Sequence, residues 1–158
     1  MEKEAYELVN LLTERGLQVS CAESCTGGMC ARMITDVPGA SAVFEGGAVT
    51  YSNRIKHKLL GVSEEVLRIH GAVSSECACG MASGVRELYG ADIAFSLTGI
   101  AGPGGGTPDK PVGTVYLGIS TKEATYSRLL TLSGNREEIR RQAALEAMRE
   151  CLFAVKEL

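Results

Sequence analysis

The sequence predicts an α/β fold: a single domain with a mixed parallel and antiparallel sheet and helices on both faces of that sheet. Helical segments alternate with the first three β-rich segments, which is the order of a parallel sheet covered by helices. Two more β-rich segments follow in close succession and predict an antiparallel hairpin. The chain has 158 residues, of which 45% are hydrophobic and 22% charged, so residues 1–158 are expected to form one globular domain.

Six segments have apolar residues at helical spacing, or a capping residue in front of them. They are residues 4–15, 29–37, 53–60, 63–71, 74–89 and 135 to near the C-terminus. Gly16 closes the first of these predicted helices. Ser52, Ser63 and Ser74 precede three of the others as N-caps.

Five segments are short and rich in apolar or β-branched residues, as strands are. They are residues 17–22, 44–51, 92–98, 112–121 and 125–132. Gly46 and Gly47 weaken the second of these strands and can mark a bulge or the close approach of another backbone. Residues 99–111 contain so many Gly and Pro residues that neither a helix nor a strand is expected there.

The turn at residues 23–28 lies between the first predicted strand and the second predicted helix. A helix that starts here leaves its first backbone N–H groups unpaired, and such groups favour an anion. Ser24 would lie beside these donors, as a nucleophile that forms an oxyanion must. The alternative is that Ser24 is an N-cap, which is the commoner role of serine before a helix. Cys25 is a rival nucleophile, because a thiol pKa can fall at a helix N-terminus.

In a sheet of this class, functional groups collect in the loops beyond the carboxyl ends of the strands. Three predicted loops lie there and together supply four polar side chains: Ser24, Tyr51, Lys56 and Thr98. Neither histidine has the acidic neighbours that would orient it as the base of a triad. A lysine that burial partly deprives of its charge can act as the general base instead, and Lys56 is the candidate. The alternative is that Lys56 belongs to a solvated helix face within residues 54–58.

The glycine-rich segment 99–111 also has two interpretations. Its unshielded backbone amides can cradle a phosphate or a carboxylate, or the segment is a flexible surface loop. It contains neither a Walker A motif nor a G-x-G-x-x-G that opens a helix, which disfavours those routes to binding a nucleotide triphosphate or a dinucleotide. Pro103, Pro108 and Pro111 favour a binding loop over a linker.

Composition disfavours several classes of function. The net charge is −3 and there is no basic run, so no nucleic-acid partner is expected. No apolar run approaches the length of a membrane span and the charged N-terminus lacks a signal-peptide core, which predicts a cytoplasmic protein. The six cysteines form no C-x-x-C pair and no zinc spacing with His57 or His70, so neither a metal nor a cofactor is expected.

Four motifs, in this order, resemble the CinA C-terminal domain family, whose enzymatic members are nicotinamide-nucleotide amidases. They are AESCTGG at residues 22–28, TYSN at 50–53, LTGIAGP at 97–103 and KPVGTV at 110–115. The triplet at residues 134–136, before the last predicted helix, also matches, so the resemblance covers nearly the whole chain. Longer family members carry a further N-terminal domain, and the chain is similar to the stand-alone form.

The resemblance implies hydrolysis of the carboxamide of nicotinamide mononucleotide to nicotinate mononucleotide and ammonia, in pyridine-nucleotide salvage. Carried onto this sequence, Ser24 would be the nucleophile and Lys56 the general base. Tyr51 and Thr98 would support the proton transfer, and an arginine at the start of the last helix, Arg136 or Arg140, would hold the substrate. With the backbone amides that could stabilise an oxyanion or bind the phosphate, the expected substrate-binding positions are Cys25, Thr26, Gly27, Gly28, Gly99, Gly102, Gly104, Gly105, Arg136 and Arg140.

Two other functions stay open at this point. The chain could be a non-catalytic nucleotide-binding or regulatory module, or an interaction domain whose glycine-rich loop packs against another subunit. The small residues of segment 79–84 suit an oligomer interface as well as a core, and a homo-oligomer is expected.

Overall fold

The structure, a computed structural model, describes residues 1–158 and consists of six α-helices, one short 3-10 helix and five strands. In chain order they are α1 (Lys3–Arg15), β1 (Val19–Glu23), α2 (Met29–Thr35), η1 (Ala40–Ala42), β2 (Phe44–Val49), α3 (Asn53–Leu60), α4 (Glu64–Ile69), α5 (Ser75–Tyr89), β3 (Ile93–Gly99), β4 (Thr114–Thr121), β5 (Thr125–Thr131) and α6 (Arg136–Lys156). The predicted helices and strands are all present, and their ends shift by a few residues. The 3-10 helix η1 was not predicted.

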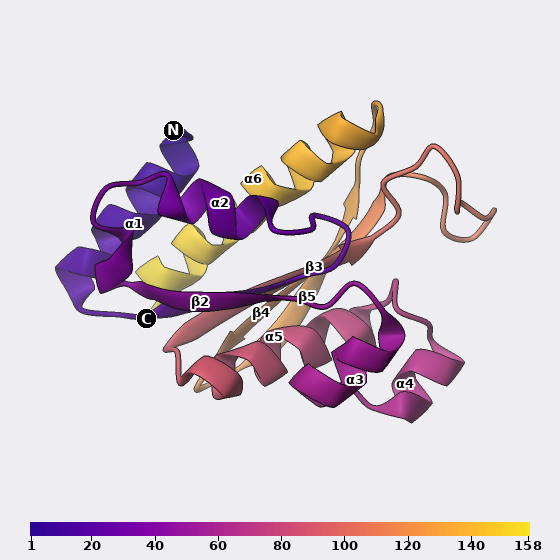
Figure 1. Ribbon diagram of the computed structural model, residues 1–158, viewed down its shortest axis with the longest axis horizontal. Helices are drawn as coiled ribbons and strands as arrows, with labels where there is room; N and C mark the ends of the chain where they lie inside the picture. Colours follow the sequence, from indigo (N-terminus) through magenta and orange to yellow (C-terminus); the bar gives the residue numbers. More distant parts are fainter.

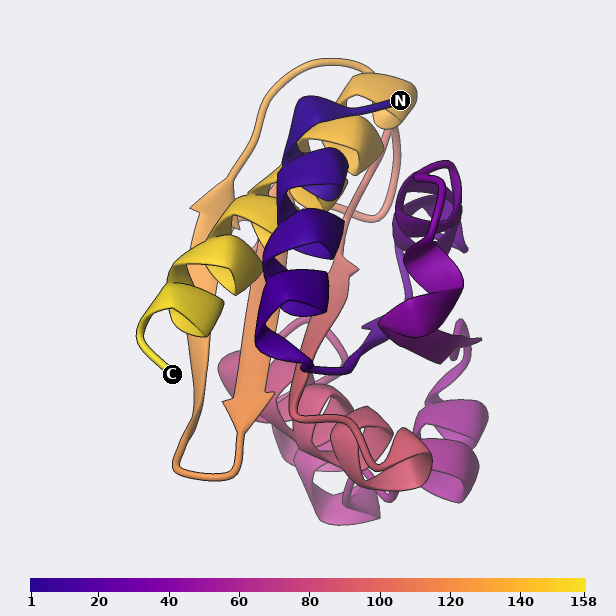
Figure 2. The same ribbon diagram turned by 90° about the vertical axis from the view of Figure 1, so that its left-hand side faces the viewer.

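The sheet is mixed, as predicted, with strand order β2-β1-β3-β4-β5. Strand β1 pairs in parallel with both β2 and β3, and β4 pairs antiparallel with β3 and with β5. Helices cover both faces: α1, α2 and α6 lie on one side and α3, α4 and α5 on the other (Figure 1). Helices α1 and α6 run side by side across their face (Figure 2). The predicted fold class is therefore confirmed.

The two faces of the sheet are packed differently, because the strands present large side chains to one side and small ones to the other. Phe95, Leu117 and Ile119 belong to the main core under α1 and α6. The opposite face is lined by small residues, so α5 can approach closely, and the hydroxyl of Ser96 donates a 2.6 Å hydrogen bond to the carbonyl of Ala78. A small second core lies between this face and α5 and includes Leu60 at the end of α3.

The arrangement brings several loops to one edge of the sheet. The parallel strands β1, β2 and β3 end at that edge, and the chain leaves them through residues 24–28, 50–52 and 100–113. The last of these segments projects from the sheet in Figure 1. The N-terminal end of α6 also lies close by, because Arg136 contacts Gly102. None of the helices combines the length and the hydrophobicity that a transmembrane helix requires.

Candidate active site

Ser24 and Lys56 meet directly at this edge of the sheet. Ser24 follows the last residue of β1, and Lys56 lies on the inner face of α3, where it and Leu60 are the buried residues. Lys56 Nζ lies 2.8 Å from Ser24 Oγ, although 32 positions separate the two residues in the sequence. Only 1% of Lys56 is exposed, so the alternative of a solvated lysine is wrong.

The surroundings of Lys56 Nζ suit a neutral amine as well as an ammonium ion. Besides Ser24 Oγ, the nitrogen contacts the carbonyl oxygens of Thr50 at 2.8 Å and Tyr51 at 3.2 Å. An ammonium ion would donate a hydrogen bond to each of the three oxygens. A neutral amine would donate to the two carbonyls and accept the proton of the Ser24 hydroxyl with its lone pair. Both protonation states are therefore satisfied without moving the side chain.

No carboxylate forms an ion pair with Lys56. Burial removes water from the ammonium form, and this desolvation lowers the pKa of Lys56 below its ordinary value of 10.5. The neighbouring thiols of Cys77 and Cys25 oppose the shift and are smaller influences. The geometry and the direction of the pKa shift both suit a lysine that accepts a proton from serine.

The carboxylate of Glu23 caps helix α2 and occupies the position where a bound anion was expected. Glu23 is 1% exposed, and its carboxylate accepts hydrogen bonds from the backbone N–H groups of Cys30, at 2.8 Å, and Ala31, at 3.1 Å. These donors belong to the first turn of α2, so the prediction that they are available to an anion beside Ser24 is wrong for this pair. The Glu23 carboxylate instead ties the start of α2 to the end of β1.

The turn between Glu23 and α2 leaves other backbone donors unused. The N–H of Ser24 bonds to Leu97 and that of Gly27 bonds to the Ser24 carbonyl, whereas the N–H groups of Cys25 and Thr26 bond to nothing in the chain. They directly follow Ser24. Backbone amides in this position are the usual components of an oxyanion hole.

Cys25 is a poor rival to Ser24. The residue is 7% exposed, and burial raises the pKa of its thiol to about 11, against an ordinary value of 9.0. The prediction that its pKa can fall at the helix N-terminus is therefore wrong. Desolvation exceeds the attraction of Arg140 and Lys56 for the thiolate.

Tyr51 and Thr98 lie at the mouth and the wall of the site, respectively. The Tyr51 side chain is exposed, and its hydroxyl accepts a 3.3 Å hydrogen bond from Arg136, while its carbonyl contacts Lys56. The Thr98 hydroxyl is buried and donates to the carbonyl of Ala72 at 2.9 Å. Neither hydroxyl bonds to Ser24 or Lys56 in this structure, so their part in proton transfer stays a prediction.

The two arginines of α6, which the sequence could not separate, have different contacts. Arg136 donates to the carbonyl of Gly102 and to the Tyr51 hydroxyl. Arg140 donates to the carbonyls of Cys25 and Thr26, at 3.0 and 2.9 Å, and so braces the turn that carries Ser24. Only Arg136 lines the cavity that contains Ser24 and Lys56.

This cavity has a volume of about 220 Å³. The residues that line it come from the three loops, the end of β3, the link between α4 and α5, and the helices α3 and α6: Ser24, Cys25, Tyr51, Asn53, Lys56, Ala72, Val73, Thr98, Gly99, Ala101 and Arg136. Gly104 and Gly105 are exposed and lie outside it, and Gly102 reaches it only through its contact with Arg136. No three His, Cys, Asp or Glu residues are grouped so that they could hold a metal ion.

Sequence reasoning missed the roles of Glu23, Asn53 and the segment Ala72–Val73. Glu23 was included in the predicted turn, but it is the last residue of β1 and lies away from the N-cap position of α2, so no local capping pattern marks its role. Ala72 and Val73 line the cavity through the short link between α4 and α5. No pattern in the sequence marks that link, because only the packing of α4 and α5 places it there.

Comparison with known proteins identifies the family. The CinA C-terminal domain matches residues 1–154. A competence-damage inducible protein of Caldanaerobacter subterraneus is 55% identical over 92% of this chain, and a CinA-like protein of Syntrophotalea carbinolica is 51% identical over 91%. The chain spans only 36% and 35% of the lengths of these two relatives.

Solved structures agree over nearly the whole chain. A CinA superfamily protein of Klebsiella pneumoniae has a TM-score of 0.95 at 32% identity, and the match covers 99% of this chain and 98% of that one. A competence/damage inducible protein of Agrobacterium tumefaciens has a TM-score of 0.90 at 40% identity, with the same coverage. The chain therefore belongs to the CinA C-terminal domain family.

Proposed function

We propose that this domain hydrolyses the carboxamide of nicotinamide mononucleotide to nicotinate mononucleotide and ammonia, with Ser24 as nucleophile and Lys56 as general base. The observation that carries the proposal is the 2.8 Å contact between a buried, carboxylate-free Lys56 Nζ and Ser24 Oγ at the wall of a cavity. Family membership supports the substrate only through the resemblance of the motifs, since the names of the relatives state no reaction.

In the first half of the reaction, neutral Lys56 takes the proton of the Ser24 hydroxyl while Ser24 Oγ bonds to the carboxamide carbon. The N–H groups of Cys25 and Thr26, which have no acceptor in the chain, would donate to the oxygen that becomes negative. Lys56, now an ammonium ion, gives its proton to the leaving nitrogen as the carbon–nitrogen bond breaks. Ammonia departs and the nicotinate group remains as an ester on Ser24.

In the second half, water takes the place of ammonia. Lys56 accepts a proton from the water as the water oxygen bonds to the ester carbon. The ester bond then breaks, and the proton passes from Lys56 back to Ser24 Oγ. One water is consumed for each ammonia released, and Lys56 returns to the neutral form.

The direct test is ammonia release from nicotinamide mononucleotide by the purified domain. Ser24→Ala should lower kcat by about 10³-fold or more, because no other nucleophile is in place. Lys56→Arg should be similarly inactive, because a guanidinium group stays protonated and cannot accept the proton. Lys58→Arg is the matched control, as it lies on the exposed face of the same helix and should keep wild-type activity.

Thermal unfolding of each variant separates lost chemistry from lost folding. An active Ser24→Ala variant with an inactive Cys25→Ala variant would reverse the assignment of the nucleophile. Tight binding of nicotinamide mononucleotide without any turnover by the wild-type domain would instead identify the non-catalytic nucleotide-binding module.

A further inference from the structure

Strand β5 forms one outer edge of the sheet, and β4 is its only partner in the chain (Figure 2). At one end of the β4–β5 ladder, the N–H of Leu132 donates to the carbonyl of Gly113 at 2.9 Å. Because the bonded residues of an antiparallel ladder alternate, Tyr126, Arg128 and Leu130 share their hydrogen bonds with β4. The residues whose backbone N–H and C=O groups point away from the sheet are Thr125, Ser127, Leu129 and Thr131.

The two outer edges of the sheet differ in how well they could accept another strand. The pairing of β2 with β1 is irregular, and Tyr89 lies against Gly46 and donates its hydroxyl to the carbonyl of Gly47 at 3.2 Å. Irregular pairing is one way in which proteins prevent edge strands from joining. The ladder of β5 is regular over residues 125–131, and Leu129 on this strand is 56% exposed. The β5 edge is therefore suited to pair with another strand.

Helix α6 carries an exposed aromatic side chain beside the same edge. Phe153 is 60% exposed and, with Tyr126 of β5, lines a groove of about 500 Å³, which we call the acidic groove. A further groove of about 430 Å³, which we call the leucine groove, lies between α6 and the other end of β5. Its apolar lining includes Leu130, Leu132 and Leu145. The chain thus has an unburied phenylalanine and an unfilled apolar groove on one side of the sheet.

The charges of the two grooves are complementary. Glu123 and Glu157 line the acidic groove, and neither forms an ion pair. The leucine groove contains Arg128 and Arg149, whose side chains are about half exposed although each contacts a glutamate. The acidic groove of one copy would therefore match the leucine groove of another copy that runs in the opposite direction. A two-fold axis produces this arrangement.

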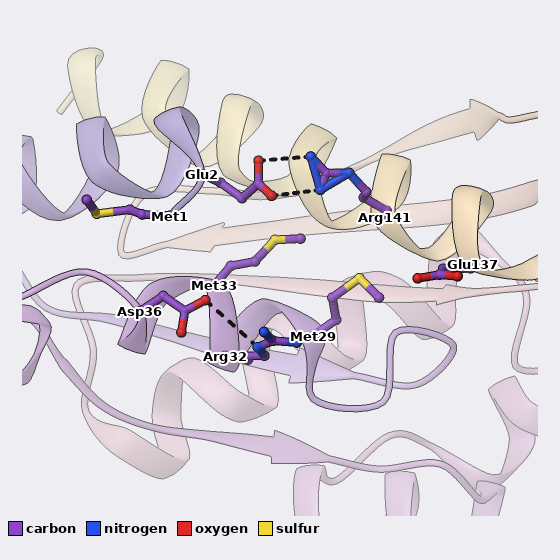
Figure 3. A pocket seen from close by; sticks show the side chains of 8 residues that line it. All are labelled: Met1, Glu2, Met29, Arg32, Met33, Asp36, Glu137 and Arg141. Carbon is purple, nitrogen blue, oxygen red and sulfur yellow. Dashed lines mark hydrogen bonds and ion pairs between the residues drawn. The ribbon is translucent and has the colours of Figure 1, made fainter.

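The cavity beside the N-terminus is less suited to hold a second copy. There Arg141 forms two hydrogen bonds with Glu2, at 2.7 and 3.0 Å, and Arg32 lies 3.8 Å from Asp36 (Figure 3). Of the charged side chains that line this cavity, Glu137 alone has no ion-pair partner. The cavity also adjoins no edge of the sheet, so it offers no free backbone groups in a row.

We propose that two copies of this chain pair through the β5 edge in antiparallel orientation, so that their sheets become continuous. The two-fold axis passes beside Leu129, which packs against Leu129 of the other copy, and Ser127 lies opposite Thr131. Each of these pairs exchanges both of its backbone hydrogen bonds. An axis beside Arg128 would instead place two guanidinium groups opposite one another, which is unfavourable.

This register also brings the grooves of the two copies together. Tyr126 of one copy lies opposite Leu132 of the other, so Phe153 of the first copy reaches the leucine groove of the second. A pair of short strands alone buries only part of the roughly 1,200 Å² that a specific interface needs. The contacts of Phe153 with the leucine groove, made twice by symmetry, supply the rest. The dimer does not depend on the proposed reaction.

Sedimentation equilibrium of the purified chain tests the interface. The wild type should have twice the monomer mass of 16.7 kDa. Leu129→Lys should raise the dissociation constant of the dimer about 30-fold or more, because two ammonium groups would meet at the axis. Phe153→Lys should weaken the dimer about tenfold or more, because the aromatic anchor is lost.

Leu88→Lys is the matched control. Leu88 is 46% exposed near the end of α5, next to Tyr89, which contacts the opposite edge strand β2, so its substitution should leave the dimer unchanged. Thermal unfolding shows whether each variant is folded. A monomeric wild type, a dimer that survives both Leu129→Lys and Phe153→Lys, or equal weakening by Leu88→Lys would overturn the proposal.

Disulfide cross-linking tests the register. Leu129→Cys should give a covalent dimer on mild oxidation, because the Cα atoms of a bonded pair lie about 5.5 Å apart, within the range of a disulfide. Thr131→Cys on the same edge should not, because the two introduced thiols would lie about 14 Å apart along the strands. The wild type gives the background, since Cys79 is its one cysteine that is not buried. Equal cross-linking at both positions, or none at position 129 in a chain that sediments as a dimer, would contradict this pairing of β5.

Discussion

Whether Lys56 is buried or solvated could not be decided from the sequence, whereas the structure shows that it is buried. It lies in the charged run Arg54-Ile55-Lys56-His57-Lys58, which is typical of a solvated helix. The helix begins at Asn53, so Lys56 and Leu60 fall one turn apart on the inner face. The other charged residues of the run are exposed. The burial of Lys56 depends on where α3 packs against the rest of the chain, and the local sequence pattern carries no information about that packing.

The cysteines allow a prediction at the same scale. Cys79 is the one cysteine that is not buried, whereas Cys25 is buried and burial raises its thiol pKa to about 11. An alkylating reagent at pH 8 should therefore modify Cys79 first, because the rate follows access and the thiolate fraction. Peptide mass spectrometry reads out the order. Faster labelling of Cys25 than of Cys79 would reinstate Cys25 as a reactive thiol beside Ser24.

Among the helices and strands, α5 shows how small residues permit close packing between two helices. The segment 79–84 was expected to suit an oligomer interface as well as a core, and the structure uses its glycines inside the chain. A side chain at Gly84 would lie 2.0 Å from the carbonyl oxygen of Leu60, so Gly84 lets α5 and α3 pack directly together. This contact supports the helix that carries Lys56. The expected homo-oligomer stays a prediction.

Two glycines of α5 form a matched pair for testing this packing. Gly84→Ala should lower the free energy of unfolding by about 3 kcal/mol, because the new methyl group collides with backbone that cannot move aside. Gly80→Ala should be neutral or stabilising by up to about 1 kcal/mol, because its methyl group meets Val62 at 3.5 Å and alanine favours helix. Urea unfolding measures both, and equal effects would contradict the account of α3–α5 packing.

The elements also show where sequence reasoning reaches its limit. Glycine C-caps, serine N-caps and β-rich runs placed the five strands and the helices α1, α3, α4 and α5, because these signals act within a few residues. The cap of α2 was not found, because the capping group is the side chain of Glu23, which lies in a strand rather than at the N-cap position. The 3-10 helix η1 has no distinct sequence signal.

For the whole molecule, the convergence of loops follows from the topology. Parallel strands β1, β2 and β3 send their carboxyl ends to one edge, which is why residues as far apart as Ser24 and Thr98 line one cavity. The separate contacts of Arg136 and Arg140 could not be predicted in this way. They depend on the angle at which α6 crosses the sheet, since both residues lie in its first turns.

Burial of thiols gives a prediction for the stability of the whole molecule. Burial raises the pKa values of five cysteines above 9.0: Cys21, Cys25, Cys30, Cys77 and Cys151. Above pH 9 the unfolded chain loses these protons and the folded chain keeps them, so stability must fall as pH rises. Each thiol contributes up to about 1.4 kcal/mol per pH unit. Lys56, with its lowered pKa, opposes part of this fall below pH 10.5.

Urea unfolding at pH 8, 9 and 10 measures the slope. The free energy of unfolding should already fall from pH 8 to 9, as the thiols of the unfolded chain begin to lose their protons, and should fall more steeply from 9 to 10. Cys151→Ala should reduce the slope, because one buried thiol is removed. Constant stability up to pH 10 would show that the thiols are not buried as described.

The pH dependence of the reaction tests the central claim most directly, namely that a neutral Lys56 activates Ser24. The value of kcat/KM for nicotinamide mononucleotide, measured from pH 6 to 9, should rise with pH as Lys56 loses its proton. It should approach a plateau at a pH below 10.5, the ordinary pKa of lysine, because burial lowers the pKa of Lys56. A rate that is flat or falls across this range would contradict a lysine base and leave Ser24 without its activating group.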